Sequence, residues 1–200
     1  MPELSRSDQQ SRYLLMIPLP RAVAVRIEDR FLPKLGATRP AMGYHISLVG
    51  PFFWVDQMTD NTLERLQRAC ARAKPLQLTI SGLDVFENAP DDCGVFLNVH
   101  PLGPVRQLYE QMLAALSDDI TLQYHRAGPY RPHITIGLNL PSQVCQSLRN
   151  SVVTPFHARF CANELWLMEQ PPMSPWLPLL ALSLGSAKPP RALSRERADG

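Results

Sequence analysis

The spacing of apolar and polar positions changes along the chain between a helical and a strand-like period. Apolar residues recur every three to four positions in four segments, as in helices with one buried face. These helical segments are residues 21–36, 59–73, 104–116 and 142–153. Short apolar or alternating runs lie between them and predict strands. The strand segments are residues 12–20, 44–53, 75–87, 93–100, 133–140, 155–160, 164–169 and 176–184.

The order of these segments repeats once. In each half a strand leads through a proline into a helix, followed by a strand that contains a histidine, and then by a helix that ends before a proline and a further strand. The two halves cover about residues 12–91 and 92–184. A duplication of this length predicts two similar lobes that enclose a cleft, a common place for a ligand. We therefore expect an α+β fold with two small, mostly antiparallel sheets and helices outside.

The two ends of the chain differ in composition from its centre. Residues 1–11 are mostly polar and predict an N-terminal arm, and residues 185–200 have the composition of a flexible tail. The apolar run at residues 13–20 is too short for a signal sequence or a membrane helix. We therefore expect no membrane association.

Composition is typical of a soluble globular protein, with 45% hydrophobic and 19% charged residues. The net charge of +2 is too small to indicate nucleic-acid binding by itself. The four cysteines are scattered and form no C-x-x-C pair, which predicts buried free thiols in a reducing compartment. We expect a cytoplasmic monomer.

Two of the predicted strands carry a histidine and a hydroxyl residue two positions apart. The first is His45 with Ser47 in YHISL, and the second is His133 with Thr135 in PHITI. Side chains of a strand alternate between its faces. Each imidazole therefore shares a face with its hydroxyl, while the apolar neighbours point to the other face and into the core.

This arrangement suits phosphoester cleavage or transfer without a metal or other cofactor. One imidazole removes a proton from the attacking oxygen and the other donates a proton to the leaving oxygen, since histidine titrates near ~6.5. Ser47 and Thr135 can donate hydrogen bonds to the non-bridging phosphate oxygens. Gly137 is expected on the same face, where its missing side chain leaves room for a ligand.

The stretches YHISLVGPF and RPHITIGL, set in a duplicated unit, resemble the two-histidine (2H) phosphoesterase superfamily. That group includes bacterial 2′-5′ RNA ligases and 2′,3′-cyclic phosphodiesterases. The resemblance spans about residues 12–184. It implies that His45 and His133 are the catalytic pair and that Ser47 and Thr135 bind phosphate. Ser47 stands where threonine is more usual, and the second motif lacks the basic stretch of some members, which leaves the substrate open.

Further candidates surround the two motifs. Tyr44, Phe52 and Tyr130 are aromatic and suit stacking on a base, although each also suits a core or cleft wall. Arg126 and Arg131 precede the second motif and suit a phosphate clamp, although any single arginine is more often solvated surface.

Four functions fit these patterns. The first is hydrolysis of 2′,3′-cyclic phosphates on RNA ends or nucleotides, and the second is the making or breaking of 2′-5′ phosphodiester bonds in RNA. The third is a non-catalytic nucleotide- or RNA-binding module, against which two intact motifs argue. The fourth is a zinc site on His45 and His133, against which the lack of a third ligand near either motif argues.

Overall fold

The computed structural model describes residues 10–36, 39–89, 92–124, 128–150 and 156–194. The helices of this part are α1 (Arg21–Leu35), α2 (Asp60–Arg72), α3 (Leu102–Leu116) and α4 (Ser142–Asn150). The strands are β1 (Arg12–Pro18), β2 (His45–Trp54), β3 (Leu76–Ala89), β4 (Asp92–His100), β5 (Ile120–Leu122), β6 (His133–Leu140), β7 (His157–Ala162), β8 (Glu164–Gln170), β9 (Leu177–Ser183) and β10 (Arg191–Ala192). The predicted helical segments are confirmed.

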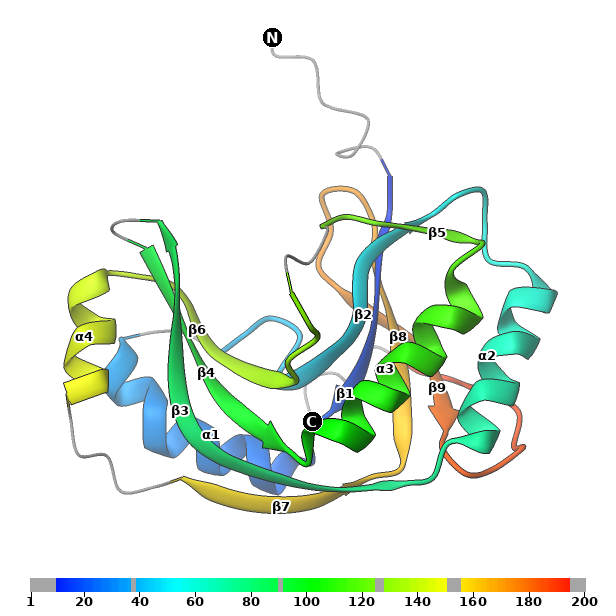
Figure 1. Cartoon of the computed structure of the whole chain (residues 1–200). Helices are drawn as coiled ribbons and strands as arrows, with labels where there is room; N and C mark the ends of the chain where they lie inside the picture. The colour runs from blue at the N-terminus through cyan, green and yellow to red at the C-terminus, as the bar shows by residue number, and fades with distance from the viewer. Residues whose placement is uncertain (1–9, 37–38, 90–91, 125–127, 151–155, 195–200) are drawn as a thin grey trace, which may run out of the picture.

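Every strand pairing among the described residues is antiparallel, and the strands form one continuous sheet in the order β10-β9-β8-β1-β2-β6-β4-β3-β7. The central contact joins β2 to β6 through Ile46 and Ile134. Helices α1 and α4 lie outside one part of the sheet, and α2 and α3 lie outside the other (Figure 1). The expected antiparallel α+β fold with outer helices is confirmed, with the two expected sheets joined edge to edge.

The two halves of the sequence exchange elements instead of folding side by side. Strands β8 and β9 of the second half continue the sheet beside β1, while β3 of the first half pairs with β4. Helix α1 contacts β6, and α3 contacts β2. Each lobe therefore contains strands from both halves, and the expected division near residue 91 does not separate the lobes.

Two strands lie outside the segments that the sequence predicts. β5 falls in the expected loop of residues 117–132 and pairs with the end of β2. β10 falls in the expected tail and pairs with β9, and the N–H of Leu193 donates to the carbonyl of Leu179 at 3.0 Å. The fold thus continues to Leu193, nine residues past the predicted end at residue 184. Residues 1–9 and 195–200 lie outside the described part.

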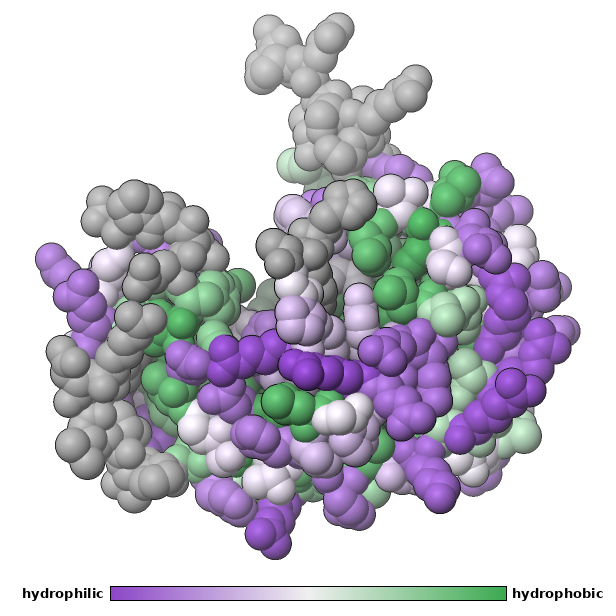
Figure 2. Space-filling view, in the orientation of Figure 1, coloured by the Kyte–Doolittle hydropathy of each residue, from purple (hydrophilic) through white to green (hydrophobic). Residues whose placement is uncertain are grey.

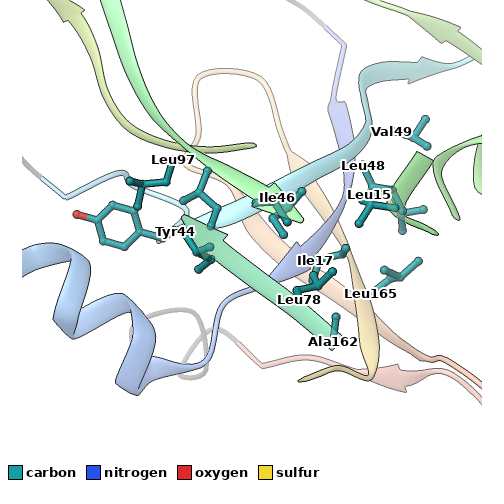
Figure 3. Close-up of a cluster of buried hydrophobic side chains, with 14 of the residues drawn as sticks. Leu15, Ile17, Tyr44, Ile46, Leu48, Val49, Leu78, Leu97, Ala162 and Leu165 are labelled. Atoms are coloured by element: carbon teal, nitrogen blue, oxygen red, sulfur yellow. The ribbon is translucent and has the colours of Figure 1, made fainter. Parts of the chain in front are cut away.

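The spacing of apolar residues in the helices corresponds to their buried faces. Helix α1 ends at Gly36, whose φ of 58° is left-handed and whose N–H donates to the carbonyl of Leu32 at 3.2 Å. Its buried residues are Val23, Ala24, Ile27, Phe31 and Leu35, and those of α3 are Val105, Leu108, Met112 and Leu116. These side chains cover the sheet face opposite the two histidines and belong to the same core as Ile46 and Leu97. Figure 3 shows the strand residues of this core, among them Ile46 and Leu97.

The cysteines differ from the expectation of four buried free thiols. Cys93 in β4 and Cys145 in α4 form a disulfide, Cys161 is exposed, and Cys70 is buried and free. The pairing was hidden in the sequence because the two cysteines are 52 positions apart and meet only when α4 packs against β4.

Candidate active site

The contact between β2 and β6 places the two histidine motifs next to each other. Ile46 lies opposite Ile134, and both side chains are fully buried. In an antiparallel pair this register sets His45 across from Thr135 and Ser47 across from His133. Because side chains alternate, all four polar side chains project from the face opposite the two isoleucines. Each histidine therefore has its own hydroxyl along the strand and the other motif's hydroxyl across from it.

The two imidazole rings are held by the same type of hydrogen bond. Nδ1 of His45 lies 3.0 Å from the carbonyl oxygen of Gly43, and Nδ1 of His133 lies 2.8 Å from the carbonyl oxygen of Arg131. A carbonyl only accepts, so Nδ1 carries the proton in both rings. The proton that each ring gains or loses is therefore on Nε2, the atom that points away from these backbone partners.

The environments of the histidines favour a neutral ring at His45. Burial lowers the pKa of His45, and the positive charge that His133 carries when protonated lowers it further. The hydrogen bond to Gly43 acts in the opposite direction and is the smaller effect against burial.

Tyr130 connects the segment before the second motif to the first motif. Its hydroxyl donates to the carbonyl oxygen of Ser47 at 3.0 Å, and its ring stacks on Tyr109 of α3 with centroids 4.4 Å apart. Nε of Arg106 donates to the Tyr130 carbonyl at 2.8 Å. Tyr130 is 5% exposed, so its side chain supports the backbone of Ser47 instead of facing a ligand.

An aromatic and charged cluster lies beside His133. The rings of Phe96 and Phe86 lie 5.2 and 6.4 Å from the His133 ring, both edge to face. The guanidinium of Arg131 lies over Phe96, 5.0 Å from the ring centre. It also donates to the carboxylate of Asp84 at 2.7 Å and to Oδ1 of Asn98 at 2.8 Å.

A second apolar cluster lies on the same face of the sheet on the other side of the motifs. Met16 pairs with Ser47 in one direction and with Trp166 in the other, which puts all three side chains on the face of the histidines. The cluster is made of buried Leu14, Met16 and Met168 with partly buried Met42, Trp166 and Trp176. The two motifs are therefore flanked by apolar side chains on both sides, and the surface is hollowed between the two parts of the molecule (Figure 2).

The structure does not bring all the predicted residues to this face. Tyr44 lies with Ile46 and Leu97 in the core on the opposite face, where burial raises its pKa to about 12 (Figure 3). Phe52 is fully buried against Tyr13 and Trp54.

The residues predicted around the second motif are also placed only partly as expected. Arg131 lies at the site but is paired with Asp84, and Arg126 lies outside the described residues. Gly137 does not face the ligand side, because a β-bulge between Thr135 and Gly137 turns it toward Leu140 and Leu35 of α1.

The residues on β3 and β4 that surround His133 were not predicted from the sequence. Phe96 and Asn98 pair with Thr135 and His133, and Asp84 pairs with Phe96. One signal was present: Asn98 is a polar residue between buried Leu97 and Val99, the same type of alternation that marked the histidines. Which strand stands beside β6 cannot be read from this alternation.

Among the described residues, no group of three or more histidine, cysteine or acidic side chains is placed to hold a metal ion. No helix in the same part of the chain is long and apolar enough to cross a membrane. The expectation of a metal-free reaction stays a prediction, for which the diagonal arrangement of two histidines and two hydroxyls gives the chemical basis.

The comparisons with known proteins point to one group. The family model of the 2′-5′ RNA ligase superfamily matches residues 19–171. No curated protein matches the chain in sequence. Among solved structures, Escherichia coli LigT complexed with 3′-AMP has a TM-score of 0.60 and 17% identity, covering 88% of this chain and 99% of LigT.

Two further solved structures share the fold. TT0787 of Thermus thermophilus has a TM-score of 0.60 and 19% identity, covering 88% of this chain and 98% of its own. Usb1 of Kluyveromyces marxianus has a TM-score of 0.54 and 15% identity, covering 89% of this chain and 100% of its own. At these identities the likeness shows the fold, and the chemistry has to be argued from the residues of this chain.

Proposed function

Because the chain belongs to the 2′-5′ RNA ligase superfamily, we propose that it is a metal-independent phosphoesterase that opens 2′,3′-cyclic phosphates on RNA ends or nucleotides. The observation that carries the proposal is the Ile46–Ile134 register, which sets two histidines and two hydroxyls diagonally around one point of the sheet. A phosphate at that point has an acid–base group on either side and a hydroxyl donor next to each.

His45 is the general base of the proposed reaction. Its lowered pKa keeps Nε2 unprotonated near neutral pH, and the bond from Nδ1 to Gly43 fixes the ring. Nε2 accepts a proton from a water molecule, whose oxygen attacks the phosphorus of the cyclic ester. The Ser47 and Thr135 hydroxyls donate hydrogen bonds to the non-bridging oxygens, where negative charge builds up in the transition state.

His133 is the general acid. As the bond between phosphorus and one ribose oxygen breaks, protonated Nε2 of His133 gives its proton to that oxygen, while Nδ1 keeps its bond to the Arg131 carbonyl. The products are a ribose hydroxyl and a phosphate monoester. His45 ends protonated and His133 neutral, so exchange of one proton each with solvent restores the starting state.

The same groups also support the second candidate, the making or breaking of 2′-5′ phosphodiester bonds. In that reaction a ribose hydroxyl replaces water as the attacking or leaving group, and the two histidines exchange roles with direction. Apolar clusters on both sides of the motifs favour a substrate with a group on each side of its phosphate. The complex of LigT with 3′-AMP supports a nucleotide as the ligand class. We expect the enzyme to act as a cytoplasmic monomer.

An assay with excess EDTA tests the proposal. Purified protein is incubated with nucleoside 2′,3′-cyclic phosphates, with RNA ending in a cyclic phosphate, and with a 2′-5′-linked dinucleotide, and the products are separated by chromatography. The proposal expects monoester products from the cyclic substrates, undiminished by EDTA, and none from a variant with both His45→Ala and His133→Ala. Activity that vanished with EDTA and returned with zinc or manganese would refute it. Cleavage of the dinucleotide alone would favour the second candidate.

A further inference from the structure

We propose that Phe86, supported by Phe96 and Arg131, is the platform on which the nucleobase of the substrate stacks. The inference rests on the proposed function and names the group that the site recognises beside the phosphate. It assigns the base to the His133 side of the cleft and its phosphate to the point between the two motifs. The occupant is a purine or pyrimidine ring, because every base has a flat face that stacks on an aromatic ring.

Gly94 makes room for the Phe86 ring to lie against the sheet. Phe86 is opposite Gly94 in the β3–β4 ladder, and a Cβ atom at Gly94 would overlap the Phe86 ring. Gly94 is not among the glycines with a left-handed φ, so its backbone does not require glycine. Glycine inside a strand weakens the strand and often marks a place of close approach. Here the close approach is that of a flat aromatic ring on the side of the sheet that carries His133.

Phe96 and Arg131 lie next to Phe86 in the same cluster, on the side of the sheet that carries His133. Phe86 and Phe96 are stacked with centroids 5.5 Å apart and an interplanar angle of 27°. Phe96 is 4% exposed, whereas Phe86 is partly exposed and the Arg131 side chain is 52% exposed. The parts of the cluster that a ligand can reach are therefore the Phe86 ring and the Arg131 guanidinium.

The partners of Arg131 make a stacking role more suitable than that of a phosphate clamp. Asp84 offsets the charge of the guanidinium and Asn98 fixes its orientation, while Phe96 lies under it. A guanidinium held in this way presents a flat face, and arginine planes stack on nucleobases. Two flat groups, one aromatic and one cationic, thus both pack against Phe96 next to His133.

The contrast with the other flank decides the side. Among the described residues, the contacts between an aromatic ring and either of the two motif histidines are those of His133 with Phe96 and Phe86. On the other flank, Met16 stands between Ser47 and Trp166, and Nε1 of Trp166 is bonded to Glu164 at 2.7 Å. A base on Phe86 therefore lies directly beside the proposed acid.

Binding to two probes measures the platform independently of turnover. The probes are adenosine 2′-monophosphate and 1,4-anhydroribitol 2-phosphate, which has the same sugar phosphate without the base, and calorimetry gives the ratio of their affinities. Stacking on one aromatic side chain is worth about 5- to 150-fold. We expect wild type to prefer the adenosine probe by a factor in this range. Phe86→Leu should reduce the preference strongly and Phe86→Trp should retain it.

Gly94→Ala provides a second test that leaves Phe86 itself in place. Its added methyl group must displace the ring, so the preference should fall as it does in Phe86→Leu. The matched control is Val25→Ala, an exposed apolar residue of α1 on the outer side of the sheet, which should bind both probes as wild type does. Circular dichroism verifies that each variant is folded.

Several outcomes would overturn the platform. They are equal affinity of wild type for both probes, no binding of either probe, or a preference that survives Phe86→Leu and disappears in Trp176→Leu. Turnover separates this inference from the proposed function. Equal kcat/KM on base-bearing and base-free cyclic phosphates would refute the platform and leave the phosphoesterase standing. A strong base preference in binding with no turnover of any substrate would do the reverse.

Discussion

Ile46 lies directly across from Ile134 where β2 meets β6, and both side chains are fully buried. This apolar pair fixes the register of the site, because a slip by one residue would turn every side chain of a strand to the other face. The polar residues on either side of each isoleucine are consequently set on the open face. The geometry of the candidate site is thus determined by packing on the opposite side of the same two strands.

Removing either imidazole should abolish most of the activity while leaving the fold intact. General acid–base catalysis by one positioned group is worth roughly 10²–10⁴-fold. We expect His45→Ala and His133→Ala each to lower kcat/KM on cyclic substrates within that range. Thermal unfolding should show a folded protein, since both rings lie on the open face. The control is His157→Ala, an exposed histidine of β7. Wild-type rates in both alanine variants would disprove the acid–base assignment.

The hydroxyls of Ser47 and Thr135 should increase the rate by stabilising the transition state. Loss of one donor to a developing oxyanion typically lowers kcat by about 10²–10³-fold. Ser47→Ala and Thr135→Val should show losses of this kind, with smaller changes in KM. Ser47→Thr and Thr135→Ser keep the hydroxyl and should retain most of the rate. If the variants that keep a hydroxyl were as slow as those that lose it, the role would be packing instead of phosphate binding.

Much of the fold and the centre of the site followed from the sequence, because both depend on local periods. Helical spacing located the four helices of the described part of the chain, and strand alternation grouped His45 with Ser47 and His133 with Thr135. The same alternation also places Tyr44 with Ile46 on the core face, so its prediction as a stacking residue conflicted with a rule already applied. Tyr44 and Phe52 were chosen for chemical type, and packing decided otherwise.

The rest of the fold depends on pairing between strands that are far apart in the sequence, and the spacing of apolar residues does not reveal which strands pair. β8 adds to β1 and β3 adds to β4 across the predicted boundary between halves, and within the second half β4 adds to β6. The flanks of the site, including Phe96, are set by these pairings. Bulges add a second difficulty, because one extra residue in β6 moves Gly137 off the face that simple alternation predicts.

Tyr130→Phe should lower kcat with little change in KM. The substitution keeps the ring stacked on Tyr109 and removes the hydroxyl that donates to the Ser47 carbonyl. A buried carbonyl left without a donor costs about 1–3 kcal/mol, and the strand at Ser47 can relax to recover part of it. A displaced Ser47 hydroxyl weakens its contacts to the transition state first, so we expect a decrease of roughly tenfold in kcat. Steady-state kinetics on a cyclic nucleotide measures the two parameters separately.

The matched control for this substitution is Tyr124→Phe, which removes a hydroxyl from a tyrosine that is 64% exposed. It should leave both parameters unchanged. If Tyr130→Phe raised KM and left kcat unchanged, Tyr130 would act on ligand binding and not on the position of Ser47.

The cysteines should differ in reactivity. Cys161 is exposed and should react with an alkylating agent in the native protein, whereas burial raises the pKa of Cys70 to about 12 and should protect it. Cys93 and Cys145 should react only after reduction and unfolding, as followed by mass spectrometry. Reaction of all four thiols in unreduced, unfolded protein would show that the pair is not bonded.

Loss of this disulfide should lower stability. It closes a loop with a sequence separation of 52, and such cross-links typically contribute about 2–4 kcal/mol. Cys93→Ser with Cys145→Ser should therefore unfold at lower denaturant concentration, and reductant should affect wild type but not this variant. Disulfides persist mainly in oxidising compartments. The oxidation state of the pair in protein recovered from cells thus also tests the expected cytoplasmic location.

The last prediction concerns pH. The proposed mechanism needs His45 neutral and His133 protonated, so kcat/KM should follow a bell with its maximum near neutrality. The acid limb reports protonation of the base. Because burial and then the charge of His133 lower the pKa of His45, this limb should extend below the pH at which an ordinary histidine titrates, near ~6.5. His45→Ala should remove the limb together with most of the rate.

Stability should show the same lowered pKa of His45 without any substrate. Well above the ordinary histidine pKa of about 6.5, the ring is neutral in both the folded and the unfolded chain, so it contributes no pH dependence. As the pH falls below that value, the unfolded chain binds the proton first, and the free energy of unfolding decreases until the folded ring is protonated too. Denaturant titrations between pH 5 and pH 8 should therefore show a smaller loss of stability on acidification in His45→Gln than in wild type. His157→Gln, at an exposed histidine, should behave as wild type. Equal pH dependence in wild type and His45→Gln would mean that His45 titrates normally, and it would remove the reason for assigning the base to His45 instead of His133.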